Sequence, residues 1–131
     1  MKFERRNTVE EAEVYESMVF KKTDSEIRNP DGSIVFSAKN IEIPEGWSQV
    51  AADVLAQKYF RKAGVPKVLK KVYEEGVPVF LQRSTEDIEA LEKIIPEERY
   101  TSETTATQVF DRLVGAWAYW GWKGNYFDSE K

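Results

Sequence analysis

The 131-residue sequence predicts an α+β fold, in which an N-terminal β-hairpin packs on a small set of helices and the C-terminal half is rich in helix. Two observations predict this fold class. Apolar residues alternate with polar ones on both sides of a turn near residue 30, and two later segments carry apolar residues at helical spacing. Because a chain of this length can bury roughly two-thirds of the surface that it exposes when unfolded, we expect one domain over residues 1–131.

The hairpin is expected over residues 14–43, after a flexible arm at residues 1–13. The stretches "VYESMVFKKTDSEIR" and "SIVFSAKNIEI" both contain period-two alternation and are joined by "NPDG". Pro30 presets the turn, and Gly32 accepts the positive φ that closes it. A two-stranded ribbon is only marginally stable alone, so the hairpin must pack on another element.

That element is the helix expected over residues 45–63. Gly64 and Pro66 end it, because neither residue continues a helix well. Apolar residues recur along it at helical spacing: Trp47, Val50, Ala51, Val54, Leu55 and Tyr59.

Residues 65–100 are expected to form a connector, since glycine and proline interrupt every periodic pattern there. The connector holds one short helix after Ser84, whose hydroxyl can cap the amides that follow. A last helix is expected over residues 102–122, opened by Thr101 or Ser102, with Glu103 near its positive end.

The last helix is unusual because its side chains are apolar or small around its whole circumference. The stretch "VFDRLVGAWAYWGWKGNYF", residues 109–127, holds seven of the chain's 17 aromatic residues. Such a helix is stable only when other structure covers it, and tryptophans at helical spacing more often form a core or an interface than a stacking site. The candidate partner-contact residues are Trp117, Trp120, Trp122, Tyr126 and Phe127.

The chain contains no cysteine and no histidine. Disulfides, thiolate nucleophiles, the usual zinc sites and the serine and cysteine triads are therefore excluded. Adjacent glutamates point about 100° apart on a helix and do not share a site, so we interpret three such pairs as solvated surface: Glu10–Glu11, Glu74–Glu75 and Glu97–Glu98. We therefore nominate no catalytic, cofactor-binding or metal-binding residue.

Six basic residues and no acidic one lie between Val54 and Tyr73, in a chain with a net charge of −4. We interpret this stretch as a solvated face or a surface for acidic partners. A phosphate site stays open as the second reading, although no glycine-rich phosphate loop or recognition module accompanies the charge. The basic residues are Lys58, Arg61, Lys62, Lys67, Lys70 and Lys71.

No apolar run approaches the roughly 20 residues that cross a bilayer, and the first residues lack the apolar centre of a signal peptide, so we expect a cytoplasmic protein. The final "DSEK" has the residues that begin a helix. We therefore expect the sequence to be the front part of a longer protein.

Three stretches resemble the opening segment of the adenosylcobalamin-dependent (class II) ribonucleotide reductases, in that family's order and rough spacing. They are "SEIRNPDGSIVF", "EIPEGWSQVAADVLAQKYFRKAGVP" and "TATQVFDRLVGAWAYWGWKGNYFDSEK". The resemblance implies an oxidoreductase of DNA synthesis that converts ribonucleotides, as ribonucleoside diphosphates, to deoxyribonucleotides. Cobalt–carbon homolysis would generate a cysteine thiyl radical, and a cysteine pair would supply the electrons.

The family's catalytic barrel and its cysteines lie beyond the segment that this chain resembles, so the resemblance assigns no catalytic residue here. It implies a structural or interface-forming N-terminal domain that is inactive alone and needs no cofactor of its own. Its expected partner is the remainder of the reductase, with a homo-oligomer also expected. Two alternatives stay open: a free-standing module for nucleotides or single-stranded nucleic acid, in which aromatic rings stack on bases, and a protein–protein adaptor.

Overall fold

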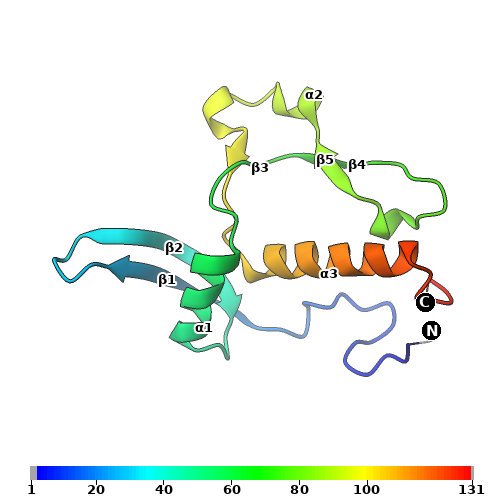
Figure 1. Ribbon diagram of the computed structural model, residues 1–131, viewed down its shortest axis with the longest axis horizontal. Helices are drawn as coiled ribbons and strands as arrows, with labels where there is room; N and C mark the ends of the chain where they lie inside the picture. The colour runs from blue at the N-terminus through cyan, green and yellow to red at the C-terminus, as the bar shows by residue number, and fades with distance from the viewer. Residues whose placement is uncertain (1–2, 131) are drawn as a thin grey trace. The chain divides into compact units, whose positions relative to one another are not determined.

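The computed structural model describes residues 3–130 and has the mixed α+β composition that the sequence predicts (Figure 1). The chain divides into two compact units. We call Arg5–Phe60 with Glu103–Val109 the hairpin unit. The C-terminal unit comprises Arg61–Ser102 and the described parts of Met1–Glu4 and Phe110–Lys131. A single domain over residues 1–131 stays a prediction.

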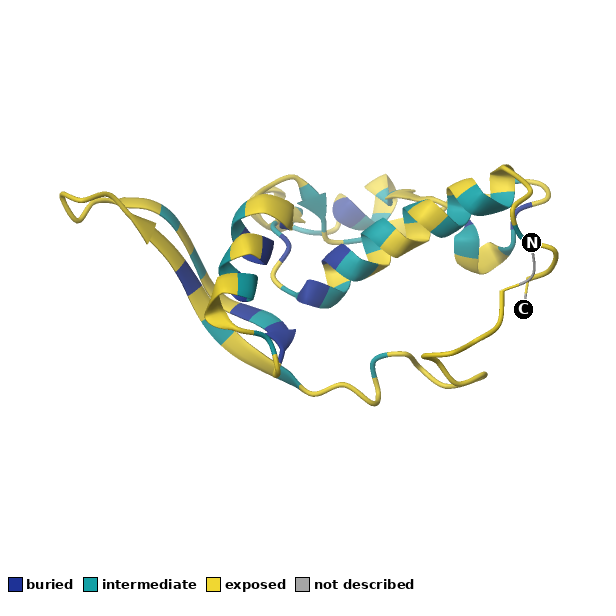
Figure 2. Cartoon of the chain, turned by 60° about the horizontal axis from the view of Figure 1, so that its bottom comes forward, coloured by how far each residue is buried: buried dark blue, intermediate teal, exposed yellow. Residues whose placement is uncertain are grey.

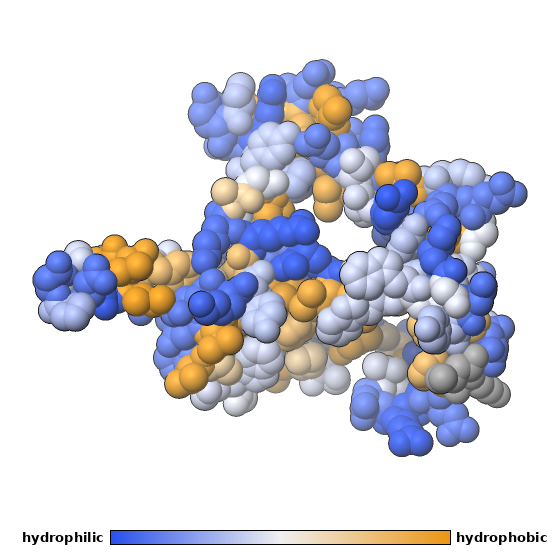
Figure 3. Space-filling model, viewed as in Figure 1, coloured by the Kyte–Doolittle hydropathy of each residue, from blue (hydrophilic) through white to orange (hydrophobic). Residues whose placement is uncertain are grey.

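The hairpin unit begins with two antiparallel strands, β1 (Phe20–Arg28) and β2 (Ile34–Pro44). The expected turn is confirmed: Gly32 has a φ of 86°, and its N–H donates to the carbonyl of Asn29 at 2.9 Å. The strands start later than residue 14, because residues 14–17 form turns. The half of the hairpin near the turn keeps apolar side chains such as Ile34 and Val35 exposed. Figure 3 shows hydrophobic surface on this end of the hairpin, at the left of the view.

A register shift interrupts the hairpin between Thr23 and Ser25. Asp24 of β1 lies opposite two residues of β2, Lys39 and Asn40, so the extra residue belongs to β2. The Oδ1 of Asp24 accepts a hydrogen bond from the N–H of Asn40 at 2.8 Å. Asn40 has a φ of 53°, a left-handed conformation that asparagine tolerates better than most residues. The bulge therefore depends on one carboxylate and one asparagine, and bulges of this kind bend a ribbon.

The first helix is α1 (Gln49–Val54), which continues directly as the π-helical turn η1 (Leu55–Tyr59). Ser48 caps it by accepting from the N–H of Ala51 at 3.2 Å, so the helix begins four residues after the expected residue 45. It ends before the expected residue 63, because Phe60 is already extended.

Most of the buried apolar side chains belong to the hairpin unit, where they lie on β2, α1, η1 and the start of α3 (Figure 2). Packing of the ribbon on the helix that follows it agrees with the sequence-based expectation. These residues are Ile41, Ile43, Ala52, Leu55, Ala56, Phe60, Ala106 and Val109.

The connector contains two short antiparallel pairs that the sequence pattern did not predict. β3 (Val65–Pro66) pairs with β6 (Tyr100–Thr101), and β4 (Leu69–Lys71) pairs with β5 (Ser84–Glu86). Strands of two or three residues are too short to show a periodicity, which is why the pattern misses them.

Ser84 does not cap a helix, because it lies in β5 opposite Lys71. The short helix α2 (Ile88–Leu91) is capped instead by Asp87, whose Oδ1 accepts from the N–H of Ala90 at 3.2 Å. Two 3-10 turns complete the connector, η2 (Val79–Leu81) and η3 (Pro96–Glu98).

The last helix, α3 (Ala106–Lys123), begins four residues later than the expected residue 102. Thr105 and Gln108 form a reciprocal capping box: Gln108 N–H donates to Thr105 Oγ1 at 3.3 Å, and Thr105 N–H donates to Gln108 Oε1 at 3.0 Å. Among residues 3–130, no helix has the length and apolarity needed to span a membrane.

We predict that Asn40→Val lowers the free energy of unfolding by about 1–2 kcal/mol, because a β-branched residue is strained at positive φ. Asn40→Gly is the matched control and should change stability by less than about 0.5 kcal/mol, since glycine adopts this conformation freely. Urea denaturation of the chain measures both. Equal losses in the two variants would show that the asparagine side chain, and not the backbone conformation, holds the bulge.

Candidate functional site

The candidate site comprises the second half of α3 and the anchored loop, which we define as residues 72–83 between β4 and β5. Both belong to the C-terminal unit. The loop is closed at its base, where the N–H of Val72 donates to the carbonyl of Arg83 at 2.8 Å. Compact loops with adjacent ends are frequently functional, so the contacts that hold this one matter.

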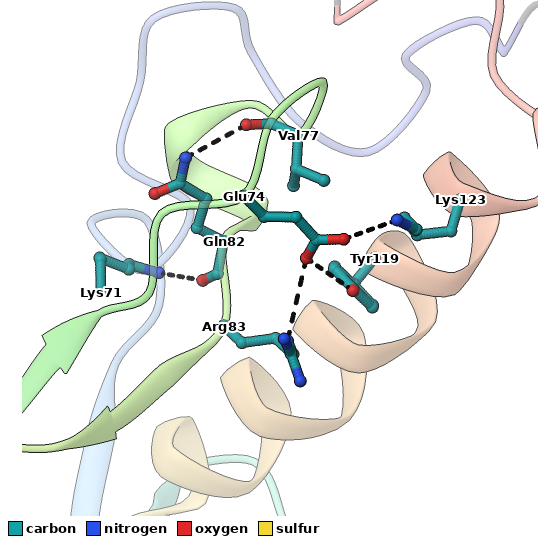
Figure 4. Close-up of polar contacts among 7 residues, drawn as sticks. All are labelled: Lys71, Glu74, Val77, Gln82, Arg83, Tyr119 and Lys123. Carbon is teal, nitrogen blue, oxygen red and sulfur yellow. Dashed lines mark hydrogen bonds and ion pairs between the residues drawn. The ribbon is translucent and has the colours of Figure 1, made fainter.

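Glu74 is the centre of the contact between the anchored loop and α3 (Figure 4). Its Oε1 accepts from Lys123 Nζ at 2.6 Å, and its Oε2 accepts from Tyr119 Oη at 2.8 Å. Arg83 Nε lies 3.9 Å from Oε2, and the guanidinium carbon is 5.8 Å from the centre of the Tyr119 ring. One carboxylate therefore joins the loop to two successive turns of the helix.

The charge distribution around Glu74 shifts three pKa values. The hydrogen bond from Lys123, then that from Tyr119, lowers the pKa of Glu74 below its ordinary 4.5. Hydrogen bonding to Glu74 raises the pKa of Tyr119 above 10.0 and the pKa of Lys123 above 10.5. The pairing is thus fully charged, with the phenol protonated, across the neutral pH range.

The rest of the anchored loop is fixed from inside. Val77 is buried, and its carbonyl accepts from Nε2 of the buried Gln82 at 3.3 Å. Lys71 Nζ donates to the carbonyl of Gln82 at 2.9 Å. On the helix side, Trp122 Nε1 donates to the carbonyl of Gly76 at 2.7 Å. The loop is therefore held at its base, at its middle and along its contact with α3.

Another face of α3 carries an exposed stripe of apolar side chains, Val114, Trp117 and Trp120. Their spacing of three residues places them along one side of the helix, with Trp117 about half a turn from Tyr119. Trp117 is 59% exposed and Trp120 is 65% exposed. The helix is thus covered on one face by the anchored loop and presents indole rings to solvent on another.

The end of α3 is closed by a Schellman motif. Asn125 has a φ of 56°, and the N–H of Tyr126 donates to the carbonyl of Gly121 at 2.9 Å. This turn directs Phe127 back onto the helix, where a Cβ on Gly121 would lie 2.6 Å from the ring. Phe127 also meets Phe3 edge to face, with ring centres 5.5 Å apart.

The five aromatic residues expected from the sequence to contact a partner therefore differ in their surroundings. Trp117, Trp120 and Tyr126 are exposed, whereas Trp122 and Phe127 are half-buried and contact other residues of this chain. The interpretation of Glu74 as solvated surface is wrong, because its carboxylate accepts from Tyr119 and Lys123. These partners lie 45 and 49 residues away, so no local sequence pattern indicates them.

Two of the basic residues are engaged within the C-terminal unit. Lys67 pairs with Glu98 at 3.8 Å, and Lys71 at the base of the anchored loop donates to the carbonyl of Gln82. Within residues 3–130, no group of three or more acidic side chains could hold a metal ion.

Residues 21–131 match the N-terminal region of the family described as class II vitamin B12-dependent ribonucleotide reductase, and the chain belongs to that family. The resemblance seen in the sequence is confirmed.

Individual relatives agree with the family. The chain is 60% identical, over all of its 131 residues, to proteins of Bradyrhizobium diazoefficiens and Agrobacterium fabrum named vitamin B12-dependent ribonucleotide reductase. A reductase of the same name from Streptomyces clavuligerus is 26% identical over 113 residues, which are 85% of this chain and 11% of the relative. The chain spans about a tenth of the length of these relatives.

We predict that Glu74→Gln lowers the free energy of unfolding at neutral pH and weakens the dependence of that free energy on pH in the acidic range. Because the pKa of Glu74 is lowered on folding, its contribution is present above the ordinary pKa of 4.5 and is lost as pH falls through the lowered value. The free energies of unfolding of the wild type and the variant, measured by urea denaturation from pH 7 down to about 3, should therefore converge as the pH falls. The control is Glu75→Gln, an exposed carboxylate in the same loop; if it behaves like Glu74→Gln, the contacts of Glu74 are not the cause.

We predict that Gly121→Ala displaces the Phe127 ring, because the added methyl group would lie 2.6 Å from two of its carbons. The measurement is the nuclear Overhauser contact between Phe3 and Phe127, which should disappear. Gly115→Ala is the control on the same helix: a Cβ there meets no atom within 4 Å, so the contact should remain and the helix should gain up to about 1 kcal/mol. Retention of the contact in both variants would contradict the packing of Phe127 on Gly121.

Proposed function

We propose that this chain is the N-terminal segment of an adenosylcobalamin-dependent ribonucleotide reductase, an oxidoreductase that makes deoxyribonucleotides for DNA synthesis in the cytoplasm. The observation that carries the proposal is the family match over residues 21–131, with 60% identity to reductases along the whole chain. The segment itself serves as structure and interface, and the chemistry occurs in the rest of the enzyme.

The residue types of the segment support this division. The parent reaction needs redox-active cysteines, and this chain has none. Imidazole and thiolate, the side chains that best bind late first-row metals, are also absent, so the segment offers cobalt no such ligand. We therefore assign the catalytic residues and the cofactor contacts to the remainder of the reductase.

The partner contact is proposed to centre on Trp117, Trp120 and Tyr126, with the half-buried Trp122 and Phe127 at its margin. A buried tryptophan removes on the order of 200 Å² from water, roughly 5 kcal/mol at about 25 cal/mol per Å² before entropy is subtracted. Exposed indoles of this size are expected to be covered by the remainder of the reductase chain. In the isolated segment the same face would favour self-association, and a homo-oligomeric enzyme is consistent with it.

The two alternatives have less support. A phosphate-binding role for the basic stretch is weakened because Lys67 and Lys71 are engaged within the chain. The adaptor alternative does not explain why all 131 residues of this chain align with a reductase at 60% identity.

The test uses the full-length protein that contains this segment. It should reduce ribonucleotides only when adenosylcobalamin and a dithiol reductant are both supplied, and the 131-residue chain alone should show no turnover. Turnover by the isolated chain, or none by the full-length protein with any ribonucleoside di- or triphosphate, would refute the proposal.

The docking face has its own test in the full-length enzyme. Trp117→Ser with Trp120→Ser should expose the interface and lower activity by about tenfold or more, since each truncation removes a large buried aromatic anchor. The matched control is Val50→Ser, an exposed apolar residue of α1 outside the proposed contact, which should leave activity within about twofold. Equal activity of the double variant and the wild type would place the indoles outside any interface.

A further inference from the structure

The anchored loop presents three large apolar side chains to solvent. Tyr73 is 80% exposed, Val79 is 70% exposed and Phe80 is 63% exposed. Single exposed apolar residues are ordinary, but three on one short loop are not explained by the packing of this unit.

The loop is rigid enough to act as a preformed contact. Tyr73 lies directly before Glu74, whose carboxylate is fixed by Tyr119 and Lys123. Val79 and Phe80 lie in η2, whose turn is closed by hydrogen bonds from Leu81 and Gln82 to the carbonyl of Pro78 at 2.9 and 3.1 Å. A loop that is already ordered loses little conformational entropy when it binds, which favours its use in recognition.

The charges of the loop indicate what kind of surface it meets. Glu74 and Arg83 interact with each other and with α3, and Lys71 at the base donates into the loop. Glu75 is the remaining charged residue between positions 72 and 83. Because both cations are engaged within the unit and do not form a basic cluster for phosphate, an apolar protein surface fits the loop better than a nucleotide or nucleic acid.

The area of the three side chains indicates which protein supplies that surface. Three side chains cover a few hundred Å² at most, well below the roughly 1,200 Å² of a stable interface between separate molecules. A segment covalently joined to its partner avoids most of the entropy cost of association, so a small patch suffices. The reductase relatives are about ten times as long as this chain, which provides such a covalent partner.

We propose that the anchored loop is a second docking element, which inserts Tyr73, Val79 and Phe80 into an apolar surface of the same reductase chain beyond this segment. The identity of the partner, the remainder of the reductase chain, rests on the proposed function. Glu74 is then a positioning residue: it does not touch the partner but holds the loop in the shape that does.

The test is hydroxyl-radical footprinting of the full-length protein, read residue by residue by mass spectrometry. Tyr73 and Phe80 should oxidise several-fold more slowly than Tyr100, although Tyr100 is only 47% exposed in this segment. Oxidation of Tyr73 and Phe80 as fast as Tyr100 overturns the inference. Protection that appears only with added ribonucleotide, or only at high protein concentration, also overturns it, because the occupant is then a ligand or a second copy.

Two pairs of substitutions make the result specific to the loop. Val79→Ser with Phe80→Ser should raise the oxidation rate of Tyr73 at least about threefold, since loss of two anchors opens the contact. The control pair is Ile88→Ser with Ile95→Ser, two other exposed residues of this unit, and it should leave the oxidation rate of Tyr73 unchanged. Equal rates in both pairs refute the loop's role. Footprinting does not depend on turnover, so the two proposals can fail separately. An active reductase with an unprotected loop refutes this inference alone. A full-length protein without reductase activity refutes the proposed function.

Discussion

The pairing of the Glu74 carboxylate with Lys123 and Tyr119 is the interaction on which the C-terminal unit depends. Val77 and Leu91 are the buried apolar residues identified in this unit, so packing alone orients its elements weakly. Directed polar bonds take over that task, because a carboxylate that accepts from an ammonium group and a phenol fixes both distance and direction. Together with the bond from Trp122 to the carbonyl of Gly76, this pairing holds the anchored loop against α3.

The two units are thus stabilised in different ways. In the hairpin unit, Ile41 and Ile43 of β2 are almost wholly buried, and removing apolar area from water supplies most of the stabilisation. Both units leave large apolar side chains in solvent, such as Val35 in the hairpin unit and Trp117 in the C-terminal unit. The difference between the units is therefore how much apolar area each one buries.

The sequence predicts those features that depend on neighbouring residues. The "NPDG" turn and the two helices were recognisable because their signals lie within a few positions of each other. The start of α3 could have been placed better, since Thr105 and Gln108 have capping-box spacing. The short strand pairs and the Glu74 junction could not be predicted, because their partners are distant in the sequence and their composition is ordinary.

The separation of Glu74 from its partners also affects how the chain folds. The bonds from Trp122 to Gly76 and from Lys123 to Glu74 close loops of 46 and 49 residues, and such closures are entropically costly before neighbouring structure has formed. During synthesis the anchored loop leaves the ribosome about 40 residues ahead of Lys123, a delay of roughly 2–8 s at about 5–20 residues per second. Through that interval Tyr73 and Phe80 belong to an unanchored nascent chain, a natural target for chaperones that bind exposed apolar segments.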